Sequence, residues 1–238
     1  MKITKEFEGL TRRENGDYVF EGNIIADESI EIKLDDKLVI TGSIASKGSI
    51  VAGDGIEAGW GINAGWGINA GEGIKAGLGI EAGWGIKAGL GIEAGCDIKA
   101  GCDIKAGLGI VAGCDINAGC DIKAGDGIEA GWGIKAGLGI KAGWGINAGE
   151  GINAGRGIKA GLGIEAGEGI NAGFGIEAVF GINAGLGIEA GTFISSETRI
   201  FAGTSIYKKS TNCVKSIRCA ELREGEIAYG ELEIKPIE

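Results

Sequence analysis

The chain has 238 residues, with 50 glycines, a single proline and a formal net charge of −10. The acidic balance argues against a protein that binds the phosphate backbone of nucleic acids, because such proteins present a basic face. Aperiodic glycine at this level would indicate disorder. Here the glycines are regularly spaced between hydrophobic residues, which predicts an ordered, all-β chain.

Residues 1–31 are irregular, with a turn at Asn15-Gly16-Asp17, and we expect them to form an N-terminal cap. They contain no apolar segment of the kind found in signal peptides, and no stretch of the chain has the composition of a membrane span. We therefore expect a cytoplasmic protein that does not bind membranes. Because the cytoplasm is reducing, we expect most of its six cysteines to be free thiols.

A resemblance to a known family begins near residue 20. The segments Phe20-Glu21-Gly22-Asn23-Ile24-Ile25-Ala26, Ile30-Glu31-Ile32 and Ile40-Thr41-Gly42-Ser43-Ile44 resemble bactofilins, the polymer-forming bacterial cytoskeletal proteins. The resemblance covers roughly residues 20–60 and implies a right-handed β-solenoid that assembles end to end without nucleotide. The chain departs from the family in its rigid Ala-Gly-x-Gly repeat and in its sizeable C-terminal segment.

The middle of the chain is a hexapeptide repeat of the form Ile-x-Ala-Gly-x-Gly. Isoleucine occupies every sixth position from Ile44 to Ile206, and alanine follows two residues later from Ala52 to Ala190. Six is a multiple of the strand period of two and does not fit the helical period of 3.6. The repeat therefore predicts a single-stranded parallel β-solenoid over residues 32–206, with isoleucine and alanine inside.

The Gly-x-Gly segments are expected to form the bends between strands, because glycine tolerates positive φ and a close backbone approach. The second glycine is replaced by Asp97, Asp103, Asp115 and Asp121. Aspartate is among the residues best tolerated in the left-handed region, which agrees with a bend at these positions.

Two coil lengths fit the repeat. Glutamates at multiples of twelve residues favour a 12-residue coil, but that coil would stack Glu81 on Glu93, and like charges directly opposite are destabilising. An 18-residue coil instead places Glu57, Lys75 and Glu93 in one column. We favour 18 residues, although this coil also stacks Lys87, Lys105, Lys123, Lys141 and Lys159.

The absence of histidine removes the chemistry familiar from hexapeptide folds. Hexapeptide acyltransferases, which are also similar, use a histidine base, and nucleophilic serine or cysteine arrangements need one as well. In those enzymes the small residue precedes the large one, the reverse of the order here, so the handedness of the solenoid stays open. No glycine run is followed by the Gly-Lys-Ser/Thr of a phosphate loop. We expect no enzyme activity, no cofactor and no small-molecule substrate.

Four cysteines in the repeat, each followed by aspartate, form a symmetric cluster: Cys96, Cys102, Cys114 and Cys120. In 18-residue coils Cys96 would stack on Cys114 and Cys102 on Cys120, near disulfide range. Four thiolates could hold a metal, but their spacing matches no known zinc knuckle. We therefore favour the interpretation that the cysteines are small residues that fill the bends. Cys213 and Cys219 fall outside the repeat and are expected to pack in the C-terminal cap.

The residue between the two glycines, here called the corner residue, is apolar or cysteine at seventeen of 24 positions from Asp54 to Thr192. Six of the others are charged, and an inward position would rarely accept unpaired charge. The corners should therefore point outward and leave large apolar side chains exposed, which is typical of interaction surfaces. The alternative is that these side chains lie flat along the edges and only cover neighbouring glycine backbone. The predicted partner-binding residues are Trp60, Trp66, Trp84, Trp132, Trp144, Phe174 and Phe180.

Residues 207–238 lose the repeat phase and alternate as strands, as in Glu231-Leu232-Glu233-Ile234-Lys235, which predicts a C-terminal β cap. The favoured hypothesis is a non-catalytic scaffold or binding protein, a stiff rod that self-associates or docks another protein through its Trp/Leu/Phe edges. The alternative is an acidic inhibitor that mimics nucleic acid. Its carboxylates are interspersed with lysines, which weakens that reading.

Overall fold

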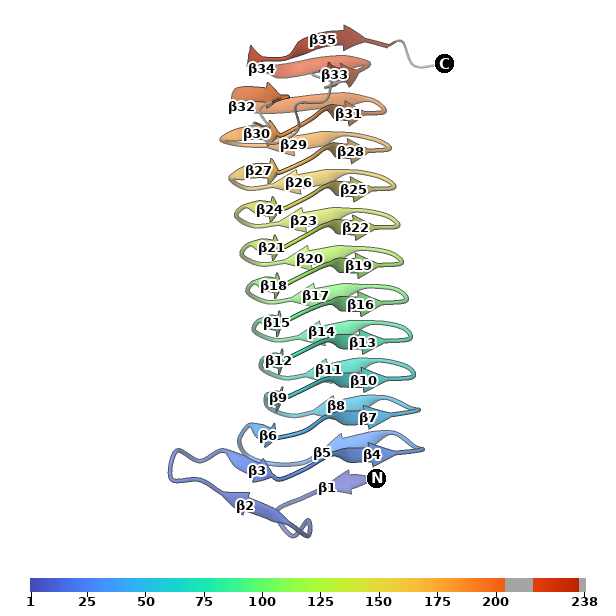
Figure 1. Ribbon diagram of the computed structural model, residues 1–238, viewed down its shortest axis with the longest axis vertical. Helices are drawn as coiled ribbons and strands as arrows, with labels where there is room; N and C mark the ends of the chain where they lie inside the picture. The colour runs from blue at the N-terminus through green and yellow to red at the C-terminus, as the bar shows by residue number, and fades with distance from the viewer. Residues whose placement is uncertain (204–215, 236–238) are drawn as a thin grey trace. The chain divides into compact units, whose positions relative to one another are not determined.

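The computed structural model describes residues 1–203 and 216–235 and divides into two compact units, Met1–Gly119 and Cys120–Glu238. In each unit short strands stack coil on coil in parallel (Figure 1). The chain is thus a parallel β-solenoid, as its repeat predicts. Within the described ranges, no helix has the length and apolar character needed to cross a membrane.

The coil length is 18 residues. Strand pairing places Ile74 between Ile56 and Ile92, and Lys75 between Glu57 and Glu93. The predicted Glu-Lys-Glu column therefore exists, and the 12-residue alternative is wrong. Each coil contributes three strands of about three residues, so the strands of one unit form three columns.

In the first unit, strand β1 (Lys2–Ile3) and the hairpin of β2 (Leu10–Arg12) and β3 (Tyr18–Phe20) precede the regular coils. One column contains β4 (Ile24–Ala26), β7 (Ile44–Ser46), β10 (Ile62–Ala64), β13 (Ile80–Ala82), β16 (Ile98–Ala100) and β19 (Ile116–Ala118). A second contains β5 (Ile30–Ile32), β8 (Ile50–Ala52), β11 (Ile68–Ala70), β14 (Ile86–Ala88) and β17 (Ile104–Ala106). The third contains β6 (Leu38–Ile40), β9 (Ile56–Ala58), β12 (Ile74–Ala76), β15 (Ile92–Ala94) and β18 (Ile110–Ala112).

The second unit repeats the arrangement. One column contains β22 (Ile134–Ala136), β25 (Ile152–Ala154), β28 (Ile170–Ala172), β31 (Ile188–Ala190), β33 (Ser216–Cys219) and β35 (Glu231–Ile234). The second contains β20 (Ile122–Ala124), β23 (Ile140–Ala142), β26 (Ile158–Ala160) and β29 (Ile176–Ala178), and the third β21 (Ile128–Ala130), β24 (Ile146–Ala148), β27 (Gly163–Ala166) and β30 (Gly181–Ala184). Strand β32 (Phe193–Ala202) pairs with both β29 and β30, and β34 (Glu221–Tyr229) pairs with β32.

The core of each unit is a ladder of isoleucines flanked by alanines. From Ile44 to Ile200 every ladder isoleucine is at most 1% exposed, and the alanine two residues later is buried in nearly every repeat. The residue between them faces solvent in most strands. Fully burying an isoleucine contributes about 1.5–3 kcal/mol, so the stability of each coil depends on its neighbours in the stack.

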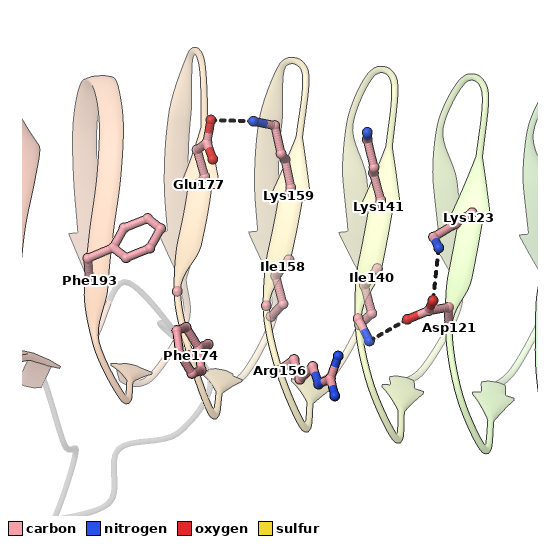
Figure 2. Close-up of a pocket in the computed structure, with 13 residues that line it drawn as sticks. Asp121, Lys123, Ile140, Lys141, Arg156, Ile158, Lys159, Phe174, Glu177 and Phe193 are labelled. Atoms are coloured by element: carbon pink, nitrogen blue, oxygen red, sulfur yellow. Dashed lines mark hydrogen bonds and ion pairs between the residues drawn. The ribbon is translucent and has the colours of Figure 1, made fainter.

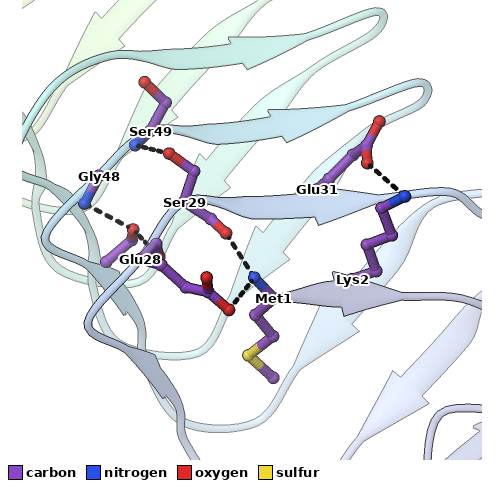
Figure 3. Close-up of polar contacts among 8 residues, drawn as sticks. Met1, Lys2, Glu28, Ser29, Glu31, Gly48 and Ser49 are labelled. Carbon is purple, nitrogen blue, oxygen red and sulfur yellow. Dashed lines mark hydrogen bonds and ion pairs between the residues drawn. The ribbon is translucent and has the colours of Figure 1, made fainter.

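The N-terminal segment pairs with a strand of the first coil of the first unit. β1 runs parallel to β5, and the Met1 ammonium donates to the Glu28 carboxylate at 2.6 Å and to the Ser29 carbonyl at 2.8 Å (Figure 3). The Ser29 hydroxyl in turn accepts the Ser49 N–H at 3.0 Å. These contacts engage polar groups of the β4–β5 turn that would otherwise lie at an open edge.

The C-terminal segment adds strands to the existing columns. Ile217 in β33 pairs with Ile188, and Leu232 in β35 pairs with Ile217, so residues 216–235 continue the parallel stacking. Cys219 is buried, as expected for a packing residue. Ile206, Cys213 and the predicted boundary between residues 206 and 207 lie outside the described residues.

Of the two reasons predicted for the glycines, close backbone approach is confirmed and positive φ is wrong. No glycine of the Gly-x-Gly bends has a positive φ; such values occur at Gly9, Gly16, Gly22, Gly203, Gly225 and Gly230. The first glycine is required by close approach instead: a Cβ at Gly77 would lie 2.0 Å from the Gly59 carbonyl oxygen of the preceding coil. Its N–H donates to the Ala58 carbonyl at 3.0 Å. Val179 occupies this position in one repeat, and there the equivalent bond to Ala160 is absent among the described residues.

The aspartates at the second glycine position are explained by hydrogen bonding. No residue other than glycine has a positive φ in the described chain, so the left-handed interpretation of Asp97 and its equivalents is wrong. The Asp97 carboxylate instead accepts the Asp115 N–H of the next coil at 3.1 Å, and Asp121 accepts the Gly139 N–H at 2.9 Å. An aspartate at the second glycine position thus accepts a hydrogen bond from a backbone N–H of the next coil, which a glycine at that position would leave to solvent.

Candidate interaction surface

The corner residues point outward, as the sequence predicts. All seven predicted partner-binding side chains are exposed, from 54% at Trp132 to 67% at Trp84. Six of the seven, all but Trp132, donate their N–H groups to corner carbonyls of the preceding coil, as from Trp84 to Trp66 at 2.8 Å. Corner residues 18 positions apart therefore stack in columns, and each coil has three corners.

In the first unit the structure brings two of the seven residues together. The rings of Trp66 and Trp84 are stacked with centroids 5.8 Å apart and planes inclined by 10°. Trp60 belongs to a different corner column, where Leu78, itself 57% exposed, donates its N–H to the Trp60 carbonyl. The first unit thus presents an indole stack and a separate Trp/Leu pair.

In the second unit the longest apolar corner column is Trp144, Leu162 and Phe180. Leu162 donates its N–H to the Trp144 carbonyl and Phe180 donates to the Leu162 carbonyl, both at 3.0 Å, and all three side chains are exposed. Trp132 is followed in its column by Glu150 and then Glu168, and Phe174 follows Arg156. The predicted residues therefore form several short apolar columns interrupted by charge, which the linear repeat does not reveal without the coil length.

The cysteine pair of the first unit is close, as the 18-residue coil predicts. The Sγ atoms of Cys96 and Cys114 are 3.0 Å apart and both residues are partly buried. Hydrogen bonding to Cys96, together with burial, raises the pKa of Cys114 to about 11. This thiol is therefore protonated at neutral pH, unlike a reactive thiolate. Cys102 is exposed in the first unit, and Cys120 belongs to the second.

The geometry around the Cys96–Cys114 pair bears on whether it could bind a metal ion. Cys96, Asp97 and Cys114 place three potential ligand atoms within 4.8 Å of one another. The Asp97 carboxylate, however, already accepts hydrogen bonds from Lys99 at 2.7 Å and from the Asp115 N–H. Two sulfurs on one tetrahedral zinc lie about 3.8 Å apart, wider than this pair. The arrangement fits a hydrogen-bonded thiol pair better than a metal centre.

Comparisons with known proteins add no family to this geometry. Neither a protein-family model, nor a curated protein, nor a solved structure matches the chain.

Proposed function

We propose that the protein is a non-catalytic, bactofilin-like cytoplasmic scaffold that associates with other copies of itself through its apolar corners. The observation that carries the proposal is the exposed column of Trp144, Leu162 and Phe180 in the second unit. Large apolar side chains on a soluble surface are costly unless a partner covers them, and aromatic residues dominate the energy of interfaces. Neither nucleic acid nor a membrane is a proposed partner.

Sedimentation velocity over a range of concentrations tests this proposal. The wild-type chain should form oligomers or polymers as its concentration rises, and the double variant Trp144→Glu/Phe180→Glu should shift the association to at least tenfold higher concentration. Asn153→Glu/Asn171→Glu adds the same charge at exposed strand positions and should leave association unchanged. A wild-type chain that stays monomeric at high micromolar concentration contradicts the proposal.

The acidic-mimic alternative has less support from the side-chain contacts. Lysines neutralise many of the repeat carboxylates, as in the Lys75–Glu93 pair at 3.0 Å and the Lys159–Glu177 pair at 2.5 Å. A mimic of nucleic acid needs a continuous negative face. Displacement of DNA from a basic DNA-binding protein by this chain would favour the alternative over the scaffold.

A further inference from the structure

A groove in the second unit lies outside the proposed association surface, apart from one shared residue, Phe174. It has a volume of 640 Å³, within the range of small-molecule sites, and its floor is the glycine strip of Gly139, Gly157 and Gly175. The walls are formed by Lys123, Lys141, Arg156, Lys159, Phe174 and Phe193 (Figure 2). Four cations face two carboxylates here, those of Asp121 and Glu177, in a chain that is acidic as a whole.

One end of this groove shows how a carboxylate binds to the floor. Asp121 accepts the Gly139 N–H at 2.9 Å and the Lys123 ammonium at 2.8 Å (Figure 2). Asp97 does the same in the first unit, with the Asp115 N–H and Lys99. An Asp-Ile-Lys segment thus holds a carboxylate between its own lysine and the backbone N–H one coil later.

The next coil has the same donors without the carboxylate. Lys141 pairs in register with Lys123, and Gly157 follows Gly139 by one coil, but residue 139 has no side chain. Among the described residues, neither the Lys141 ammonium nor the Gly157 N–H has an acceptor. Figure 2 shows the Lys123 amine turned toward Asp121, whereas Lys141 extends away from the floor.

The surroundings favour an anion at this position. Lys141 lies between Lys123 and Lys159 in the strand column, and like charges on neighbouring strands are destabilising. Lys123 and Lys159 have carboxylate partners, whereas Lys141 has none in the described chain. Arg156, exposed at the corner beside Gly157, is a second cation without an ion pair there, and its guanidinium suits a carboxylate.

The rest of the groove is apolar. Phe174 is 60% exposed on the corner wall. The Phe193 ring lies so close to Gly175 that a Cβ there would meet it at 2.5 Å, and the Arg223 guanidinium covers the ring at 3.8 Å from its centroid. In the described chain the floor at Gly157 has no side chain over it, and with Phe174 and Phe193 among the walls it suits a flat apolar body.

The first unit contains a matched groove with different electrostatics. Its floor includes Gly73, and its volume is 450 Å³. Both of its lysines are already paired, Lys37 with Glu57 at 2.7 Å and Lys75 with Glu93 at 3.0 Å. It offers no unneutralised cation for a ligand and therefore serves as an internal control.

We propose that the groove of the second unit binds a small organic acid with a planar apolar body. Its carboxylate lies between the Lys141 ammonium and the Gly157 N–H, in the place that an aspartate at residue 139 would occupy, and Arg156 adds a second positive charge. Its flat body lies on the glycine strip against Phe174. The proposal does not require self-association, although the groove shares Phe174 with the apolar corners.

Calorimetric titration with 2-naphthoate, and with the neutral 2-naphthylmethanol, tests the proposal. The wild-type chain should bind the acid at one site, at least tenfold more tightly than the alcohol. Gly139→Asp should weaken naphthoate at least tenfold, because the new carboxylate takes both donors. Lys141→Gln should weaken it about tenfold.

The controls are the equivalent changes in the first unit, Gly73→Asp and Lys75→Gln, which should leave the affinity within twofold. A Cβ at Gly73 and one at Gly139 have similar room, with the nearest contacts at 3.5 Å and 3.3 Å, and circular dichroism verifies folding. The proposal is overturned if naphthoate shows no saturable binding at millimolar concentration, if the alcohol binds equally well, or if Lys141→Gln binds as the wild-type chain does. Equal losses in the variants of both units also overturn it.

Discussion

The indole of Trp66 stacks on that of Trp84 one coil later, with ring centroids 5.8 Å apart and planes only 10° from parallel. Both rings are mostly exposed, so the pair is held by the 18-residue register rather than by a surrounding core. Stacked aromatic pairs interact by more than their buried area, so this contact is measurable through its effect on stability.

The first prediction follows from that stack. Trp66→Ala should lower the free energy of unfolding by less when Trp84 is already replaced by alanine, because the stack is then already lost. A double-mutant cycle to alanine should give a coupling free energy of about 0.5–1.5 kcal/mol, the usual value for aromatic pairs. Additive effects of the two substitutions on the free energy of unfolding would contradict the stack.

The second prediction separates the two glycines of the bend. Gly77→Ala should lower the free energy of unfolding by about 1–3 kcal/mol, because the new Cβ meets the Gly59 carbonyl oxygen at 2.0 Å. A Cβ at residue 73 would lie 3.5 Å from its nearest neighbour, the Gly91 carbonyl oxygen, so Gly73→Ala should change the free energy of unfolding by less than about 1 kcal/mol. Chemical denaturation of both variants measures the difference, and similar losses would show that close approach is not the reason for the glycine.

The third prediction concerns Asp35 near the N-terminus. Its carboxylate accepts hydrogen bonds from Lys5 at 2.8 Å and from the Tyr18 hydroxyl at 2.7 Å, which lowers the pKa of Asp35 well below its usual value. A lowered folded-state pKa stabilises the fold above the unfolded pKa, near 3.9, and this contribution is lost as the pH falls through the folded pKa. Asp35→Asn should therefore have a lower melting temperature than wild type at pH 7, and this difference in melting temperature should narrow below about pH 4.

A matched control for that experiment is Asp27→Asn. Asp27 forms an exposed ion pair with Lys47 at 2.9 Å, and such pairs contribute little. It should melt close to wild type at pH 7. A gap between Asp35→Asn and wild type that stays constant from pH 7 to pH 3 would exclude the proposed role of the carboxylate.

The fourth prediction concerns the thiol pair. Because hydrogen bonding to Cys96 and burial raise the pKa of Cys114 to about 11, alkylation of Cys114 should be slow at pH 8 and accelerate toward pH 11. Cys96→Ala removes the hydrogen bond, so the pKa of Cys114 should fall and its alkylation at pH 9 should become faster. Peptide mass spectrometry follows Cys114 directly. Cys102→Ala is the control, and an equal acceleration in that variant would contradict the assignment.

The inward side of the coils was predictable from the sequence. Isoleucine and alanine two residues apart must share a face in a strand, and the charge column of Glu57, Lys75 and Glu93 was enough to choose the coil length. The outward direction of the corners followed from the charged residues among them. Both predictions combined the spacing of residues along the sequence with the free-energy cost of burying a charge or of stacking like charges.

The reasons for the bend residues were not predictable in the same way. Positive φ and close approach both require glycine, and only coordinates separate a 2.0 Å contact at Gly77 from a left-handed backbone. The groove proposed to bind an organic acid was not predicted, because the lysine column was taken as evidence against the 18-residue coil. Aligning Asp121-Ile122-Lys123 with Gly139-Ile140-Lys141 at 18 residues would have shown the missing carboxylate.

The core requires only that isoleucine recur every six residues, and this requirement determines which insertions and deletions the chain can accept. An insertion or deletion of any multiple of six residues returns every isoleucine to an inward position. Only multiples of eighteen keep the outward residues downstream of the change in their former columns. Glu81 and Glu93, twelve residues apart, lie in different columns, on β13 and β15. Duplicating twelve residues would therefore move every outward residue downstream of the duplication to a different column, and the isoleucine core would be unchanged.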